Sequence, residues 1–347
     1  METFFRWLLF VILVALLFIF KENRSLTEIE EEKPAVFYAN QCHDNLHQLF
    51  LEAIESANRS IFLIIYSLND RSILHALNKR ANEGIAVTIL HDPSTLKRGL
   101  PSPVITKSIE ATGLMHKKIL IVDESRVWLG SANWTRDSLK LDDNLVVGLH
   151  NPELAKAIID NKGEYSSLIR DQSIEYWSFP QKGKEGLNRL ISLIDQAKKS
   201  VYVSMFTWTH PQLTDAIIRA HARGVSVKVV LDTQTAYGAS SKTCQQLKQA
   251  KVAVSISTGF GLLHHKHAWI DETILVHGSG NWTRAAFSRN WDYFLILYPL
   301  NETQQSKLKN LWRVMLANKK HLAILWQRPE RICNPLFEPI GMFTHFT

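Results

Sequence analysis

One stretch of sequence occurs twice in this chain, and the repeat limits the folds that the chain can adopt. Residues 57–66 (ANRSIFLIIY) resemble residues 197–206 (AKKSVYVSMF) at an offset of 140 positions. Later segments match at an offset of 148, so the second copy holds eight extra residues, which we expect in a polar loop near 233–258. Self-similarity of this kind indicates two copies of one structural unit. We therefore expect the two copies to pack together across a pseudo-twofold axis.

Helical and strand patterns alternate within each unit. The predicted helices span 46–56 and 72–83, then 187–197 and 213–223. The predicted strands span 61–66, 86–90, 118–122, 127–129 and 145–149, then 201–206, 226–231, 266–270, 274–276 and 294–297. Strand-helix-strand alternation is typical of an α/β fold with a mostly parallel sheet flanked by helices. A last helix over 302–317 is expected to close the second unit.

The pattern divides the chain into five parts. The first repeat covers 35–177 and the second covers 178–328, followed by a C-terminal tail at 329–347. Residues 4–20 are apolar except for Arg6 and predict a hydrophobic helix, and 21–34 form an acidic linker.

The apolar segment at 4–20 is either an uncleaved membrane anchor or a cleaved signal. No small-residue cleavage pattern follows it, which favours a single N-terminal span with the catalytic part outside the cytoplasm. If the segment is cleaved, the protein is secreted.

Composition narrows the function only slightly. Of the 347 residues, 46% are hydrophobic, which is enough for a substantial core. The formal charge of +7 suits an anionic substrate or surface, but it does not choose between nucleic acid and phospholipid. Three cysteines, far apart and odd in number, argue against a disulfide framework and against a cysteine-rich zinc site.

Each unit holds the same polar motif. A histidine and a lysine lie two apart, an aspartate follows, and then a Gly-Ser-x-Asn-Trp-Thr segment. The histidine-to-asparagine spacing is seventeen in both units. The motif residues are His116, Lys118, Asp123, Ser131 and Asn133 in the first unit, and His264, Lys266, Asp271, Ser279 and Asn281 in the second.

This motif brings together groups suited to a phosphodiester. Residues two apart on a strand share a face, so His116 and Lys118 lie together, as do His264 and Lys266. Ammonium and carboxamide groups donate to phosphate oxygens, and imidazoles transfer protons or attack phosphorus near neutral pH. A zinc site at His264 and His267 is disfavoured, because a strand does not bring residues three apart together.

The pattern H-x-K-x-x-x-x-D followed by G-S-x-N resembles the signature of the phospholipase D superfamily, over roughly residues 35 to 320. The Asn-Trp-Thr ending is closest to small bacterial endonucleases and mitochondrial cardiolipin hydrolases, here as a fused pair. The resemblance implies a monomer containing a pseudo-dimer, with neither a metal nor another cofactor. It also implies that His116 attacks phosphorus to form a phosphohistidine and that His264 protonates the leaving alcohol. The side chains implied to bind the phosphate are Lys118, Lys266, Ser131, Ser279, Asn133 and Asn281.

The carboxylates of the two units differ. In this family the carboxylate that orients a histidine lies eleven residues after the asparagine. That position is Asp292 in the second unit but Asn144 in the first, where Asp143 could substitute after a one-residue bulge. Asp123 and Asp271 point to the opposite face of their strands from the histidines, and we interpret them as structural.

The favoured function is a membrane-associated phosphodiesterase of the phospholipase D type that hydrolyses phospholipid head-group bonds. Its expected partners are a phospholipid substrate and the membrane surface. A nuclease remains an alternative, so nucleic acid is a possible partner, and a transphosphatidylase resembling cardiolipin synthase is another.

Overall fold

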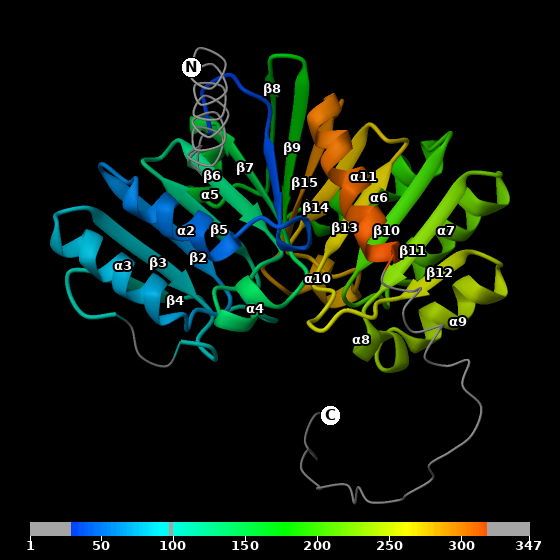
Figure 1. The fold of residues 1–347 in the computed structure, drawn as a ribbon, viewed down its shortest axis with the longest axis horizontal. Coiled ribbons are helices and arrows are strands. Elements are labelled where there is room, and N and C mark those ends of the chain that lie inside the picture. Colours follow the sequence, from blue (N-terminus) through cyan, green and yellow to red (C-terminus); the bar gives the residue numbers. More distant parts are fainter. Residues whose placement is uncertain (1–28, 97–99, 318–347) are drawn as a thin grey trace, which may run out of the picture.

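The computed structural model describes residues 29–96 and 100–317 and shows two β-sheets flanked by helices (Figure 1). The expected hydrophobic helix at 4–20 and the tail at 329–347 lie outside the described residues. Among the helices of the described part, none is both long and apolar enough to cross a membrane.

The first sheet has seven strands in the order β1-β7-β6-β5-β2-β3-β4 within the described residues. Its strands are β1 (Val36–Ala39), β2 (Ser60–Ile65), β3 (Ala86–His91), β4 (Ile105–Ser108), β5 (Lys118–Val122), β6 (Arg126–Gly130) and β7 (Leu145–His150). Its helices are the 3-10 turn η1 (Asn40–Cys42), α2 (Leu46–Glu55), α3 (Arg71–Asn82), α4 (Arg136–Lys140) and α5 (Pro152–Ile159).

The second sheet has eight described strands in the order β12-β11-β10-β13-β14-β15-β9-β8. Its strands are β8 (Glu164–Ile169), β9 (Gln172–Ser178), β10 (Ser200–Met205), β11 (Ser226–Leu231), β12 (Ala253–Ile256), β13 (Lys266–Ile270), β14 (Ile274–Gly278) and β15 (Tyr293–Tyr298). Its helices are α6 (Gly183–Gln196), α7 (Pro211–Ala222), α8 (Thr233–Tyr237), α9 (Ser241–Gln249), α10 (Arg284–Ser288) and α11 (Glu302–Ala317).

The α/β class is confirmed, but the expectation of mostly parallel sheets is wrong. Among the described strands, the pairs β2–β3, β3–β4, β10–β11 and β11–β12 are parallel and every other ladder is antiparallel. The physical reason lies in the connections. Crossover helices make neighbouring strands parallel, whereas the short turns joining β5 to β6 and β13 to β14 force antiparallel pairing. Both sheets are therefore mixed.

The division at 177/178 falls at the end of β9, and the strands just before it, β8 and β9, pair with each other and with β15 in the second sheet. One further expectation needs correction. The eight extra residues of the second unit do not form an open loop. The segment 233–258 instead holds α8, α9 and β12.

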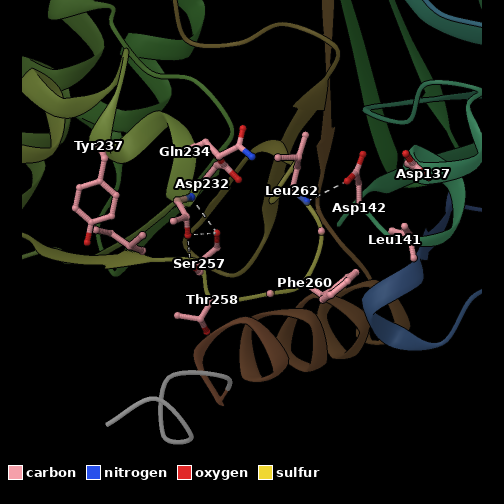
Figure 2. Close-up of a pocket in the computed structure, with 14 residues that line it drawn as sticks. Asp137, Leu141, Asp142, Asp232, Gln234, Tyr237, Ser257, Thr258, Phe260 and Leu262 are labelled. Atoms are coloured by element: carbon pink, nitrogen blue, oxygen red, sulfur yellow. Dashed lines mark hydrogen bonds between the residues drawn. The ribbon is translucent and has the colours of Figure 1, made fainter. Parts of the chain in front are cut away.

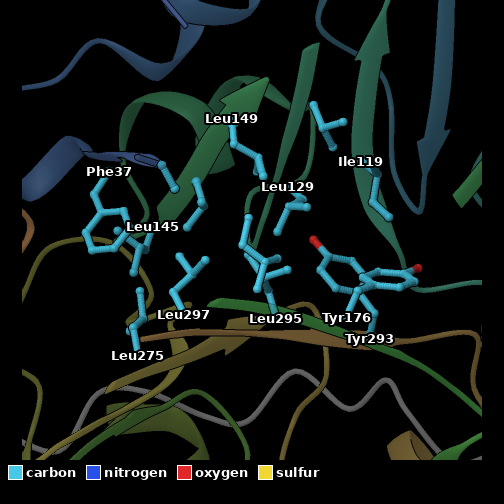
Figure 3. Close-up of a cluster of buried hydrophobic side chains, with 14 of the residues drawn as sticks. Phe37, Ile119, Leu129, Leu145, Leu149, Tyr176, Leu275, Tyr293, Leu295 and Leu297 are labelled. Atoms are coloured by element: carbon cyan, nitrogen blue, oxygen red, sulfur yellow. The ribbon is translucent and has the colours of Figure 1, made fainter. Parts of the chain in front are cut away.

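The two units share one hydrophobic core. Many of its members come from β1, β5, β6 and β7 of the first sheet and from β9, β14 and β15 of the second (Figure 3). The side chains labelled in the figure are Phe37, Ile119, Leu129, Leu145, Leu149, Tyr176, Leu275, Tyr293, Leu295 and Leu297. The apolar stripe of α11, formed by Leu308, Leu311, Trp312 and Met315, is buried in the same core. Burial of apolar surface between the sheets holds the units together and fixes the segments that meet at their junction.

Candidate active site

Each candidate histidine sits two residues before a central strand and is held by backbone from the other unit. The His116 N–H donates to the Trp291 carbonyl at 2.8 Å. In the same way, the His264 N–H donates to the Asp143 carbonyl at 3.0 Å. These bonds belong to short bridges in which Met115 pairs with Trp291 and Asp143 pairs with Leu263. The junction of the units thus brings the two motifs together.

The imidazole of His116 is oriented by Asp292 of the second unit. Its Nδ1 lies 2.8 Å from Asp292 Oδ1, which also accepts a hydrogen bond from the Ser279 hydroxyl at 2.6 Å. An ionised carboxylate only accepts, so Nδ1 of His116 must donate and Nε2 carries the lone pair. His116 is 7% exposed and Asp292 is fully buried, so this geometry is fixed by packing.

The imidazole of His264 is oriented by Asn144 of the first unit. His264 Nδ1 lies 3.1 Å from Asn144 Oδ1, which also accepts from the Ser131 hydroxyl at 2.8 Å. The Asn144 amide nitrogen donates to the Ser138 carbonyl at 2.7 Å, which fixes the amide with its oxygen toward His264. Asn144, not the neighbouring Asp143, is therefore the residue whose side chain contacts this histidine.

Both motif serines, Ser131 and Ser279, are bonded to the residues that orient the histidines, and phosphate binding by their hydroxyls stays a prediction. Each hydroxyl is fully buried and donates its one hydrogen to Asn144 or Asp292. A serine hydroxyl has a single hydrogen to donate, so neither can donate to a phosphate while these bonds hold. Both serines support the residues that orient the histidines.

The two lysines are almost completely buried beside the histidines. Lys118 Nζ donates to the His116 carbonyl at 2.5 Å, and Lys266 Nζ donates to the His264 carbonyl at 2.7 Å. An ammonium has three hydrogens, so others remain for a ligand. Burial lowers the pKa of Lys118 to about 7 and lowers the pKa of Lys266 well below its usual value. Both ammonium groups are therefore poorly solvated, which favours a bound anion.

The motif asparagines are half-buried. Asn133 Oδ1 is buried and accepts no hydrogen bond from any described residue. The side-chain oxygen of Asn281 lies 3.4 Å from the Thr207 backbone N–H, a long hydrogen bond. Neither geometry assigns the asparagines a ligand, so phosphate binding by their amide groups stays a prediction.

Two aromatic residues of the site were not predicted. The Tyr66 ring meets the His116 ring edge-on with centroids 5.1 Å apart, and Phe206 meets His264 at 5.0 Å. Lys118 Nζ lies 5.0 Å from the Tyr66 ring centroid, and the matching Lys266–Phe206 distance is 4.8 Å. The sequence did contain a signal for them, because Tyr66 and Phe206 occupy equivalent positions at the end of the first repeated strand.

Asp123 and Asp271 bind backbone and lie away from the histidines. Asp123 accepts from the backbone N–H groups of Asn58, Arg59 and Ser60 at 2.7–3.1 Å. Asp271 accepts from the matching N–H groups of Lys198, Lys199 and Ser200 at 2.7–2.9 Å. Each carboxylate ties the turn after the motif strand to the start of the first repeated strand.

The remaining motif residues pack beneath the site. Trp134 is buried against Phe50, with ring centroids 4.6 Å apart, and Trp282 packs against Trp208 at 4.5 Å. The threonines that follow them cap short helices. Thr135 accepts from the Ser138 N–H at the start of α4, and Thr283 does the same for Ala286 of α10.

His265 and His267 lie on the opposite face of β13 from His264, where they form a buried cluster with His277. In the described ranges, 29–96 and 100–317, no group of three or more histidine, cysteine or acidic side chains is arranged to hold a metal ion.

An open cavity of about 620 Å³ lies beside the segment that leads into His264, and none of the motif histidines, lysines or asparagines lines it (Figure 2). Asp142, Leu141 and Leu262 line one side of it, and Asp232 and Tyr237 line the other. Asp142 Oδ1 accepts from the Leu262 N–H at 3.0 Å, which ties this rim to the strand that begins after His264.

The electrostatic surroundings of the two histidines differ. Burial and the nearby Lys118 lower the pKa of His116, while Asp292 acts in the opposite direction. Burial, Lys266 and Lys118 lower the pKa of His264 well below its usual value, and Asn144 adds no negative charge to oppose them. The positive form is thus better stabilised at His116 than at His264.

Comparison with known proteins agrees with this arrangement. The family model described as "Cardiolipin synthase, PLD-like domain" matches residues 50–162 and again 190–312, more than half of the chain.

The mitochondrial cardiolipin hydrolase of Xenopus tropicalis is 34% identical over 128 residues, which are 36% of this chain and 60% of that protein. A phospholipase D of Rickettsia typhi is 29% identical over 176 residues, 48% of this chain and 84% of that protein.

Among solved structures, phosphatidylserine synthase from Haemophilus influenzae Rd KW20 matches with a TM-score of 0.65. The match covers 84% of this chain and 88% of that chain at 15% identity, which shows a common fold. With two matched domains and two sets of the same motif meeting at their junction, the chain belongs to the phospholipase D superfamily.

Proposed function

We propose that this protein is a membrane-associated phosphodiesterase that hydrolyses phospholipid head-group bonds through a phosphohistidine. The observation that supports this most strongly is the crossed pair of buried histidines. Each is fixed through Nδ1 by a side chain of the other unit, and each stands beside a buried lysine. Such a pair suits in-line displacement, in which one group attacks phosphorus and another assists the leaving group.

The surroundings support His116 as the nucleophile and His264 as the acid. Attack by Nε2 of His116 forms a P–N bond and places positive charge on the imidazole, which the Asp292 carboxylate stabilises. The bond from phosphorus to the alcohol oxygen breaks, and protonated His264 gives its proton to that oxygen. Water then attacks phosphorus, His264 takes a proton from the water, and the P–N bond breaks to restore His116.

Substrate binding would set the protonation state that this reaction needs. A phosphodiester brings one negative charge to a place where Lys118 and Lys266 are both poorly solvated. That charge raises the pKa of both lysines and of His264, because an opposite charge nearby favours each protonated form. The lysines then donate to the phosphoryl oxygens, where negative charge develops in the transition state.

Phospholipid is the favoured substrate class. The similar proteins named above are called cardiolipin hydrolase and phospholipase D. The apolar segment at 4–20 would keep the site at a membrane. A transphosphatidylase would use the same site, with an alcohol replacing water in the second step.

The test presents the purified full-length chain with mixed phospholipid vesicles and with single-stranded DNA, each in the presence of EDTA. Products are identified by mass spectrometry, and His116→Ala serves as the inactive control. We expect phosphatidic acid from the vesicles, with turnover unaffected by EDTA because both acid-base groups are side chains. Cleavage of DNA alone would replace the lipid assignment with the nuclease. Loss of turnover in EDTA and its recovery with zinc or magnesium would overturn the proposed mechanism.

A further inference from the structure

Large apolar side chains project from segments beside the candidate site. Phe260 is 99% exposed, Tyr237 77%, Leu141 49% and Leu114 41%. Phe260 and Leu114 belong to the segments that lead into His264 and His116. Figure 2 shows Phe260 and Leu141 on one side of the open cavity and Tyr237 across it. Exposed apolar residues scattered singly need no explanation, but a group around one opening indicates an interaction surface.

The loop that bears Phe260 is held firmly at its base. Gly261 packs so closely on the backbone of Leu141 that a Cβ atom at this position would lie 2.1 Å from the Leu141 carbonyl oxygen. The next residue, Leu262, pairs with Asp142 and Asp143 through its N–H and its carbonyl. Phe260 therefore projects from a fixed loop.

The two units differ at this loop. At the offset of 148, Phe260 corresponds to Thr112, whose hydroxyl donates to the Arg289 carbonyl at 3.2 Å. The apolar tip is thus an addition to the second unit and not a requirement of the repeated fold.

Exposed basic side chains lie on two short helices, α4 and α10, while the charged residues that line the cavity itself are Asp137, Asp142 and Asp232. Arg136 and Lys140 lie on α4, and Arg284 lies on α10 with Arg289 just after it, and all four are exposed. These two short helices follow the Asn-Trp-Thr segments of the two units and lie on the same edge of the molecule as α8 (Figure 1). Asp137 is the acidic residue of α4. Apolar tips next to exposed cations are the combination that binds an anionic lipid surface.

We propose that this face, which we call the mouth surface, docks on a bilayer containing anionic phospholipid, with Phe260 inserted beside the lipid chains. The proposal rests on the proposed function, since it places a bilayer with the phospholipid substrate beside the segment that leads into His264. Phe260 lies four residues before His264, so at most about 14 Å of extended chain separates their Cα atoms. Insertion of Phe260 would therefore hold both histidines near the head-group layer, where the scissile phosphate lies.

The docking test does not require turnover. Phe260→Cys in the full-length chain is labelled with an environment-sensitive fluorophore and mixed with vesicles of equal phosphatidylcholine and phosphatidylglycerol. Leu168→Cys is the matched control, because Leu168 is 68% exposed on β8 at the opposite edge of the molecule. The unsubstituted chain corrects for label on its own cysteines. We expect an emission blue shift at position 260 and none at position 168. Equal shifts at both positions, or no shift at 260, would overturn the docking.

A turnover comparison then separates this proposal from the function itself. Phe260→Ser should lower hydrolysis of the vesicles about tenfold or more, the effect of losing one buried phenyl group. Hydrolysis of soluble bis(p-nitrophenyl) phosphate should not change, and Leu168→Ser should leave both rates unchanged. Phe260→Trp should keep vesicle turnover at the native level or above it.

Three outcomes contradict one proposal or the other. If Phe260→Ser lowers cleavage of single-stranded DNA and spares the vesicles, the loop stacks on bases and the lipid surface is wrong. If Phe260→Trp loses vesicle turnover as Phe260→Ser does, insertion is also wrong. If the native chain hydrolyses neither vesicles nor the soluble diester while the fluorophore at 260 still shifts, the proposed function fails and the docking stands.

Discussion

The half of the site around His116 and the half around His264 have the same backbone arrangement but differ in charge. Each histidine is contacted through Nδ1 by the residue eleven positions after an asparagine of the other unit, and each such residue is supported by a serine hydroxyl. The residue is Asp292 beside His116 and Asn144 beside His264. The two otherwise matched halves thus differ in one group, which is a carboxylate beside His116 and a carboxamide beside His264. This difference favours positive charge on the His116 imidazole and easy proton release from the His264 imidazole.

The crossing of these contacts also explains why the units share a core. Neither unit holds a complete half of the site, because each histidine depends on the other unit for its orienting side chain and for a backbone hydrogen bond. A shift between the sheets would loosen both halves at once.

The largest expected effect is on the histidines themselves. His116→Ala and His264→Ala should each lower turnover by several orders of magnitude, as loss of one member of a catalytic unit does. They should fail differently with a good leaving group such as p-nitrophenol, which needs little protonation. His264→Ala should then accumulate a covalent phosphate that is acid-labile and base-stable, whereas His116→Ala should not. Intact-mass measurement after rapid quenching detects the adduct.

The opposite result has a clear meaning. An adduct on His264 in the His116→Ala protein would reverse the two roles. Full activity of both variants would show that the duplicated motif is not the active site.

Exchange of the orienting groups should have the next largest effect. Asp292→Asn removes the charge that stabilises positive His116 and should lower kcat by about 10⁴-fold, on the scale seen when a carboxylate behind a catalytic histidine is lost. Asn144→Asp adds a carboxylate behind His264, which should raise its pKa and weaken it as an acid.

The pH profile of each variant measures this effect. In the Asn144→Asp variant, the limb of the pH–rate profile that reports the pKa of His264 should move to higher pH. Equal losses of kcat in the two variants, without a shift of either limb, would remove the distinction between the halves.

The lysines predict a pH dependence of substrate capture. Burial lowers the pKa of Lys118 from 10.5 to about 7, so its ammonium form is present below that pH and is lost above it. In the free enzyme, kcat/KM for a soluble diester should therefore fall up to about tenfold per pH unit above pH 7. In the Lys118→Arg variant the arginine stays charged at all these pH values. The fall of kcat/KM above pH 7 should therefore disappear, even if the maximal rate of the variant is lower. An unchanged limb in the variant would assign it to another group.

The smallest effect on activity is expected at the two structural aspartates. Asp123→Asn should lower the free energy of unfolding by about 1–3 kcal/mol, because its charge receives three backbone N–H groups and the Arg126 side chain at 2.9 Å. Asp271→Asn should cost less, since Lys199 acts on Asp271 only through its charge, whereas Arg126 also donates a hydrogen bond to Asp123. Urea unfolding at pH 7 measures both, and a larger loss for Asp271→Asn would contradict the comparison.

The stabilisation by Asp123 should depend on pH. Burial acts to raise the pKa of Asp123, but the backbone N–H groups and Arg126 outweigh it and hold the pKa below its usual value. Its stabilisation is therefore present above the unfolded pKa near 3.8 and is lost as the pH falls through the lower folded value. The stability difference between native chain and Asp123→Asn should accordingly vanish in acid.

The sequence alone determined the repeat, the α/β class, the superfamily resemblance and the residues of both motifs. Local patterns carry this information, because alternation on a strand and spacing along the chain depend on near neighbours only. The same reasoning indicated that Asp123 and Asp271 lie away from the histidines, and it noted the unequal pair Asp292 and Asn144.

Only the tertiary structure decided which side chain contacts which histidine. Asp292 lies 176 positions from His116, and Asn144 lies 120 positions from His264, so their pairing depends on how the two sheets meet. The mixed sheets, the transfer of β8 and β9 to the second sheet and the buried hydroxyls of Ser131 and Ser279 have the same origin. Strand partners and hydrogen-bond acceptors are chosen by packing across the shared core, and the repeat pattern does not contain that choice.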